Sequence, residues 1–342
     1  MSFRKSWLEK LLLPERAPRR SAEKFFAFRL DGSTVLQEAI RNISSSGAYL
    51  ETRAKLVPES HISIVMQADG PFELNPARRI TALARVVRID GEGAGLAFIP
   101  PGDSHARRWI ELVEYCARET KPKEMLAFLQ LNAAFTFLSR ICPKAGEEID
   151  QLVRTKFSNY RIQHAVDIAL KAEMGLASEP DAEKFRAEPR AVLRIVENGS
   201  NAAEDWLQDQ WAGLLAACCS VQGKDEVEPA VVETFSRLTP SQVRILTSVC
   251  VKSTKVRSEE GNLVARPLTC DLNELMSATG ARDAQVDRDI KLLADVGLLE
   301  MSKPTIMTDG RIDLTPTSAS LLLHASYNGH RGKIEDFYSV AS

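Results

Sequence analysis

The sequence lacks most of the patterns by which an enzyme or a metalloprotein is identified. None of its six cysteines forms a C-x-x-C pair or stands at metal-ligand spacing from one of the five histidines. No G-x-S-x-G, H-E-x-x-H or P-loop motif occurs either. The run Gly91-x-Gly93-x-Gly95 lies between two predicted strands, which is typical of a hairpin. We therefore expect no enzymatic activity, no metal and no cofactor.

Long apolar runs are missing as well, and the net charge is small. The most apolar window, 125–141, is interrupted by Gln130, Asn132 and Arg140, so it falls short of the roughly 20 apolar residues that span a bilayer. The amino terminus contains no apolar stretch of signal length. The net charge of -2 gives the whole molecule no field that would draw it onto DNA or anionic lipid. These absences predict a cytoplasmic protein without a membrane span.

The first stretch with a clear secondary-structure pattern has the pattern of β-strands. Between residues 25 and 99, short segments rich in Val, Ile, Phe and Ala are separated by turn residues such as Asp31-Gly32 and Asp90-Gly91. Five strands are predicted, at 25–30, 38–52, 61–67, 79–89 and 93–99. So many short strands without a helical pattern among them predict a small antiparallel β-barrel.

From residue 104 the apolar residues recur at helical spacing. Helices are predicted at 104–119, 124–141, 159–174 and 203–220. In the last of these, Trp206 and Trp211 lie on an apolar-dominated face, and tryptophans at such spacing usually anchor a core or an interface.

The last hundred residues combine helices with a short β hairpin. Thr239 and Gln242 form a capping box at the start of a first helix, and Asp271 begins a second that ends at Gly280. A third helix ends at Gly297, and two strands joined by a polar turn follow it. Together with a final helix that we expect Thr315-Pro316 to cap, this is the element order of a winged helix-turn-helix.

The expected fold class is therefore multidomain α+β: a small antiparallel barrel, then an all-helical segment, then a winged-helix-like domain. A length of 342 residues is consistent with two or three domains. The predicted parts are an arm at 1–24, the barrel at 25–103, the helical domain at 104–234, the winged-helix-like domain at 235–330 and a tail at 331–342.

Two short motifs flank the start of the barrel. The arm contains Arg16-x-x-x-Arg20, and Asn42-x-Ser44-x-x-Gly47 follows about twenty residues later. This combination resembles the PilZ family over roughly residues 14–100. The resemblance implies a β-barrel that binds the bacterial second messenger cyclic di-GMP, and it assigns the ligand to Arg16, Arg20, Asn42, Ser44 and Gly47, with Arg19 as a weaker candidate.

The chemistry of these residues suits that ligand, which carries two phosphodiesters and two guanines. An arginine fork binds guanine O6 and N7 or bridges phosphate oxygens, and its plane stacks on a purine. Asn42 offers an acceptor for guanine N–H groups and Ser44 a hydroxyl, while Gly47 lets the backbone approach closely. The family more often has Asp where Asn42 stands but also uses Asn there, so binding is expected to survive in a weaker form.

Simpler interpretations of both motifs remain open. Arg16, Arg19 and Arg20 could form a solvated basic linker. The stretch 42–47 could be only a turn whose side chains bond to their own backbone, as in a barrel that has lost its ligand.

The carboxy-terminal half resembles a second bacterial family, abortive-infection proteins of the Abi-alpha type, from about residue 155 to 325. The residues that carry this resemblance are Leu207-Gln208, Trp211-Ala212, Leu214-Leu215-Ala216, Pro229, Leu238-Thr239-Pro240 and Ile245-Leu246. The family implies no established chemistry.

The charge of the winged-helix-like part bears on its partner. Residues 235–330 contain 11 Lys and Arg against 11 Asp and Glu, so this part lacks the usual electrostatic footprint of a DNA-binding domain. DNA binding is possible but not favoured, and a protein partner of the helical half is expected instead.

We therefore expect a bacterial cyclic di-GMP receptor whose barrel senses the nucleotide and whose helical half is the output. Ligand capture would order the arm 1–24 against the barrel. Two alternatives stay open: a transcription regulator controlled by the nucleotide, and a phage-defence or scaffold protein with a ligand-free barrel. A homo-oligomer is possible.

Overall fold

A computed structural model of the chain describes residues 20–22, 25–31, 34–44, 46–68, 79–99, 125–221, 229–302 and 310–339. The expected helix 104–119 and the tail end 340–342 lie outside these residues. The chain forms two compact units, one of residues 1–201 with 219–224 and the other of 202–218 with 225–342. Each unit is described by itself, and the domain boundaries expected from the sequence stay predictions.

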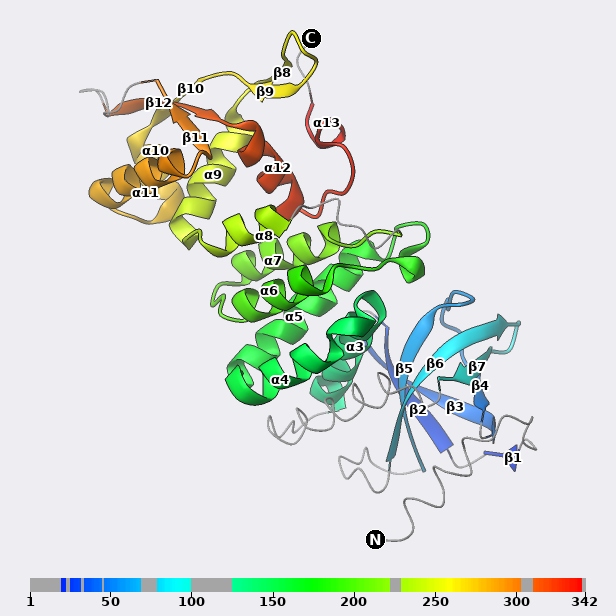
Figure 1. The fold of residues 1–342 in the computed structure, drawn as a ribbon. Helices are drawn as coiled ribbons and strands as arrows, with labels where there is room; N and C mark the ends of the chain where they lie inside the picture. Colours follow the sequence, from blue (N-terminus) through cyan, green and yellow to red (C-terminus); the bar gives the residue numbers. More distant parts are fainter. Residues whose placement is uncertain are drawn as a thin grey trace. The chain divides into compact units, whose positions relative to one another are not determined.

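The first unit begins with an antiparallel sheet that closes on itself (Figure 1). Its strands are β1 (Arg20–Ser21), β2 (Phe25–Asp31), β3 (Thr34–Ser44), β4 (Gly47–Glu51), β5 (His61–Ala68), β6 (Arg79–Ile89) and β7 (Ala94–Phe98). They lie in the order β1-β3-β2-β5-β6-β7-β4, and β4 also pairs with β3. Six strands, β2 to β7, therefore form a closed barrel, which confirms the predicted antiparallel barrel.

One of the five expected strands is wrong. The stretch 38–52 is not a single strand: its residues belong to β3 and β4, which pair as a hairpin with Ser44 opposite Gly47. The reversal falls within a triple serine, which has no Gly or Pro to mark it. The register shifts between Ile40 and Asn42, so Arg41 forms a β-bulge.

Alternation along the strands divides the barrel into a core and an outer face. The buried core side chains include Ala27, Ile40, Leu50, Ile64, Met66, Val86 and Leu96. On the outer face of β2 and β5, Phe28 and Val65 are buried as well, because helix α3 (Met125–Ile141) packs there. Phe128 of α3 lies 4.1 Å from the guanidinium of Arg79.

The rest of the first unit is helical. Its elements are the 3-10 turns Pro143–Ala145 and Ala182–Lys184 and the helices α4 (Gly146–Lys156), α5 (Asn159–Leu176) and α6 (Pro189–Gly199). Helices α3 and α5 confirm the helices expected at 124–141 and 159–174. A polar contact joins these helices to the barrel: Glu183 Oε2 accepts a hydrogen bond from the His61 backbone (3.3 Å) and lies 3.6 Å from Arg140 Nη1.

The second unit contains helices and two small sheets. Its helices are α7 (Asp205–Ala217), α8 (Pro229–Ser236), α9 (Pro240–Lys252), α10 (Leu272–Thr279), α11 (Asp283–Asp295), α12 (Ser318–Tyr327) and α13 (Ile334–Phe337). Its strands are β8 (Lys255–Arg257), β9 (Leu263–Ala265), β10 (Leu268–Asp271), β11 (Leu299–Met301) and β12 (Arg311–Pro316). β8 pairs with β9, while β12 lies between β10 and β11.

Helix ends in this unit follow local sequence closely. The capping box at α9 is present, with Gln242 N donating to Thr239 Oγ1 (3.2 Å) and Thr239 N donating to Gln242 Oε1 (2.9 Å). Asp271 caps α10, which ends at Gly280 with a positive φ of 69°. The cap expected at Thr315-Pro316 is wrong, because both residues continue strand β12. Thr317 caps α12 instead.

The two tryptophans of α7 differ in burial. Trp211 is buried and its ring lies 4.7 Å from that of Phe235, as a core residue should. Trp206 is half-buried, and the guanidinium of Arg244 lies over its ring, 4.5 Å from the centroid. Within the described ranges, no helix has the length and apolar character to cross a membrane.

Candidate functional site

The β3–β4 hairpin presents the N-x-S-x-x-G motif on the outer face of the barrel. Ile40, Ala48 and Leu50 point into the core. Because neighbours along a strand point to opposite faces, and residues paired across strands point to the same face, Asn42 and Tyr49 face outward together. Ser44 and Gly47 form the next outward pair. All three motif residues therefore lie on one surface.

Strand β1 brings the end of the arm to this hairpin. It pairs antiparallel with β3, with Arg20 opposite Ile43 and Ser21 opposite Asn42. Ala22 N adds a hydrogen bond to the carbonyl of Arg41 (3.2 Å). The two sequence motifs thus meet along one strand edge. Arg16 and Arg19 lie outside the described residues.

Asn42 and Ser44 differ in how their side chains are engaged. The Ser44 hydroxyl accepts a hydrogen bond from Ser46 N (3.3 Å) and donates one to the Gly47 carbonyl (3.2 Å), so it stabilises the turn. The half-buried Asn42 carboxamide makes no hydrogen bond within the part of the chain that the structure describes. Among the described residues, nothing occupies the donor and acceptor groups of the Asn42 side chain.

Gly47 is required by the barrel itself. A Cβ at this position would stand 2.0 Å from the carbonyl oxygen of Leu96, on the neighbouring strand β7. No rotation of a side chain relieves such a contact, because the obstacle is backbone. The glycine of the motif thus serves close strand packing, a reason that differs from the access to ligand inferred from the sequence.

A cluster around Tyr49 adjoins the motif on the outer face. The Tyr49 hydroxyl donates to Asp90 Oδ1 at 2.5 Å, and Asp90 also accepts from the backbone N–H groups of Glu92 and Gly93. The hydrogen bond from Tyr49, followed by that from the Glu92 backbone, holds the pKa of Asp90 below its ordinary value. The same bond to Asp90 raises the pKa of Tyr49.

Two arginines flank the Tyr49 ring. Arg41 lies 5.0 Å and Arg88 5.7 Å from the ring centroid, within the range of cation–π attraction. Arg41 is also bound by Glu51 (2.8 Å) and Glu92 (2.7 Å), which raise the pKa of its guanidinium. The charge of Arg41 is therefore already compensated.

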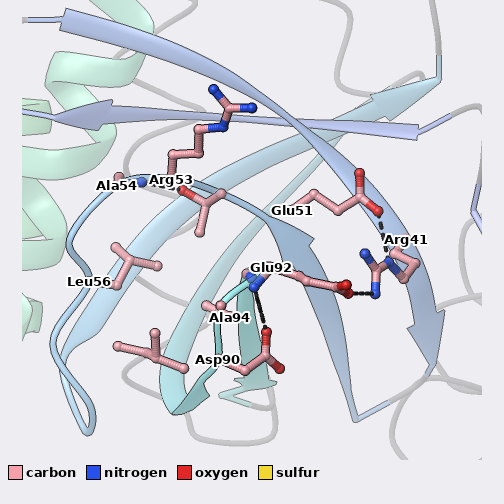
Figure 2. A pocket seen from close by; sticks show the side chains of 12 residues that line it. Arg41, Glu51, Arg53, Ala54, Leu56, Asp90, Glu92 and Ala94 are labelled. Atoms are coloured by element: carbon pink, nitrogen blue, oxygen red, sulfur yellow. Dashed lines mark hydrogen bonds and ion pairs between the residues drawn. The ribbon is translucent and has the colours of Figure 1, made fainter.

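A cavity of about 610 Å³ lies at one end of this cluster, between the end of β4 and the β6–β7 turn (Figure 2). Arg41, Glu51 and Glu92 form one wall through the two ion pairs. Ala54, Leu56 and Ile89 form an apolar part. Arg53 extends away from the Arg41 group and makes no hydrogen bond or ion pair to any residue in the described ranges.

The sequence interpretation missed Tyr49, Arg41 and Arg88 as neighbours of the motif. The alternation of β4 contains a signal for Tyr49, since it occupies the same outward phase as Gly47 and Glu51. Arg88 comes next to them only through strand pairing between distant segments, which the sequence does not reveal. Among the described residues, no group of three or more His, Cys, Asp or Glu could hold a metal ion.

Comparison with known protein families gives two matches. Residues 15–117 match the family model described as PilZ domain, and residues 162–330 match the one described as Abortive infection alpha. Neither is known as a catalytic domain. A comparison with curated proteins found no match.

Proposed function

We propose that this chain, in which a PilZ domain precedes an Abortive infection alpha region, is a receptor that binds cyclic di-GMP on the outer face of its barrel. One observation carries the proposal: the pairing of β1 with β3 sets Arg20 opposite Ile43, between Asn42 and Ser44. The arginine motif and the N-x-S-x-x-G motif therefore meet along one strand edge, although 21 residues lie between Arg20 and Asn42 in the chain.

The chemistry of that surface supports the same ligand. The unengaged carboxamide of Asn42 both accepts and donates hydrogen bonds, as the edge of a guanine requires. The arginines of the arm supply charge for the phosphodiesters and forks for guanine O6 and N7. The Ser44 hydroxyl is engaged in the turn by Ser46 N, the Ser46 hydroxyl and the Gly47 carbonyl, so Ser44 supports this surface by holding the turn.

Calorimetric titration of cyclic di-GMP into the full chain tests the proposal. We expect saturable binding that Arg16→Ala/Arg20→Ala abolishes and that Asn42→Ala weakens about fivefold, since a hydrogen bond between neutral groups contributes roughly 1 kcal/mol. Arg53→Ala is a matched control, because it removes an exposed arginine of the same barrel whose side chain extends away from the Arg41 group (Figure 2).

A negative titration has a clear meaning. If the wild-type chain gives neither heat nor a thermal shift with cyclic di-GMP, the hairpin is a retained turn and the barrel is a ligand-free interaction module. The function would then reside in the helical half, as in a phage-defence or scaffold protein.

For the output we propose a winged helix that contacts protein. The order α9, β10, α10, α11, β11, β12, α12, with the β8–β9 hairpin inserted between α9 and β10, supports the first part of this proposal. At the end of α11, which would be the recognition helix, Leu292 and the C-cap residue Val296 are exposed, and within the helix Asp287 pairs with Lys291 (2.7 Å). An apolar, charge-compensated helix face suits a protein partner better than a phosphate backbone.

Fluorescence anisotropy with a labelled 30-base-pair duplex at low and moderate salt tests this choice. We expect no binding at 150 mM salt, with or without cyclic di-GMP. Binding that Arg288→Ala and Lys291→Ala weaken would instead support the DNA-binding alternative.

A further inference from the structure

A row of outward-facing residues crosses the open side of the barrel from the motif to strand β6. Asn42 on β3 lies opposite Tyr49 on β4, Tyr49 lies opposite Gly95 on β7, and Gly95 lies opposite Arg88 on β6. Residues paired in this way share one face of the sheet. The motif and Arg88 therefore stand at the two ends of a single row.

Arg88 lies flat across this row, and Gly95 makes room for it. A Cβ on Gly95 would stand 2.8 Å from Arg88 Cγ and 2.9 Å from its Nε, so the side chain occupies the space above the glycine. From there its guanidinium reaches 5.7 Å from the Tyr49 ring. It points toward the motif side of the row.

Unlike the neighbouring arginines, Arg88 forms no ion pair with a carboxylate among the described residues. Arg41 is bound by two carboxylates, and Arg85 pairs with Glu59 at 2.5 Å. Arg88 is exposed and donates no hydrogen bond to any residue in the described ranges. Its charge lowers the pKa of Asp90 only as a minor cause, after hydrogen bonds from Tyr49 and the backbone.

We propose that Arg88 is a further ligand-binding residue, which receives the half of the cyclic dinucleotide that lies away from the arm. The inference rests on the proposed function and deepens it. A planar guanidinium beside an aromatic ring offers a fork for phosphate or guanine and a surface for purine stacking.

The dimensions agree with a ligand that spans the row. Neighbouring strands lie about 4.8 Å apart, and the Arg88 guanidinium lies 5.7 Å from the ring of Tyr49, which is paired with Asn42 on the next strand. Arg88 leans back over β7, which shortens the gap that a dinucleotide must bridge. A ligand with two phosphodiesters and two guanines can thus use the arm and Asn42 with one half and Arg88 with the other.

The test is calorimetric titration of cyclic di-GMP into the full-chain variants Arg88→Gln and Arg85→Gln, each with a thermal melt. We expect Arg88→Gln to weaken binding about tenfold, since a charge-assisted hydrogen bond is worth at least that factor. Arg85→Gln should stay within about twofold, because Glu59 already holds that charge. Both melting temperatures should match the wild type.

A second variant displaces the Arg88 side chain without replacing the residue. Gly95→Ala would push the flexible arginine off its resting place and weaken binding about threefold, a smaller loss than that of the charge itself. An Arg88→Gln protein that binds as tightly as wild type overturns the inference, and so does equal weakening by Arg88→Gln and Arg85→Gln. If the wild type itself does not bind, the proposed function fails and this inference fails with it.

Discussion

Two sides of the barrel's outer surface are built from the same kind of alternating strand, but one side is covered by a helix and the other is exposed. On β2 and β5 the outward residues Phe28, Val65 and Gln67 are buried, where α3 packs against them. On β3, β4, β7 and β6 the outward side chains include Arg41, Arg88 and other exposed charged residues.

This difference in burial separates the face that stabilises the barrel from the face that is available to bind a ligand. The covered face contributes apolar burial, which near 25 cal/mol per Å² makes large side chains such as Phe28 strong contributors. The open face has paired charges, which contribute little to stability when they are exposed, and the Asn42 carboxamide, which makes no hydrogen bond among the described residues. Substitutions on the two faces should therefore separate folding from binding.

The largest expected effect comes from a charge on the covered face. Val65→Asp would place an unpaired carboxylate at a fully buried position, and an uncompensated buried charge costs about 3–5 kcal/mol. The free energy of unfolding from urea titration would measure this loss. Val87→Asp on β6 is the matched control, since Val87 is exposed and should change stability by less than about 0.5 kcal/mol.

If Val87→Asp destabilises as much as Val65→Asp, the two faces are equally buried in solution and the comparison fails. If neither variant is destabilised, α3 does not cover β2 and β5 as the structure indicates.

A smaller effect is expected from Gly47→Ala on the open face. The new Cβ would press on the Leu96 carbonyl, and such overpacking costs about 1–3 kcal/mol. Gly95→Ala is the control, because there the added Cβ meets only the flexible Arg88 side chain. Thermal melts should place Gly47→Ala clearly below Gly95→Ala, whereas equal melts would mean that the barrel relaxes freely at β7.

Local signals explain most of what the sequence predicted correctly. The capping box of Thr239 and Gln242 and the C-cap Gly280 depend on residues within one helical turn, so short patterns sufficed. The barrel followed from alternation and turn residues. The hairpin at 44–47 was missed because its turn is made of serines. The cap of α12 was misplaced by two residues because Thr315 and Thr317 both precede a helix-compatible stretch.

Non-local features could not be predicted in the same way. The motif residues Asn42, Ser44 and Gly47 were identified from their spacing, and strand geometry then placed them on one face. That Arg88 completes a row with Asn42 depends on the register of β4, β7 and β6, including a shift between Val86 and Arg88. The sequence between these strands does not specify such a register.

The two-residue strand β1 also has a consequence for association between chains. β3 pairs with β2 only as far as Ala39, so from Arg41 onward one side of β3 depends on β1 and Ala22 for backbone partners. An uncovered strand edge is a template for pairing with another chain. Residues 20–22 therefore shield this strand edge, and a chain that lost them would tend to pair with its own copies.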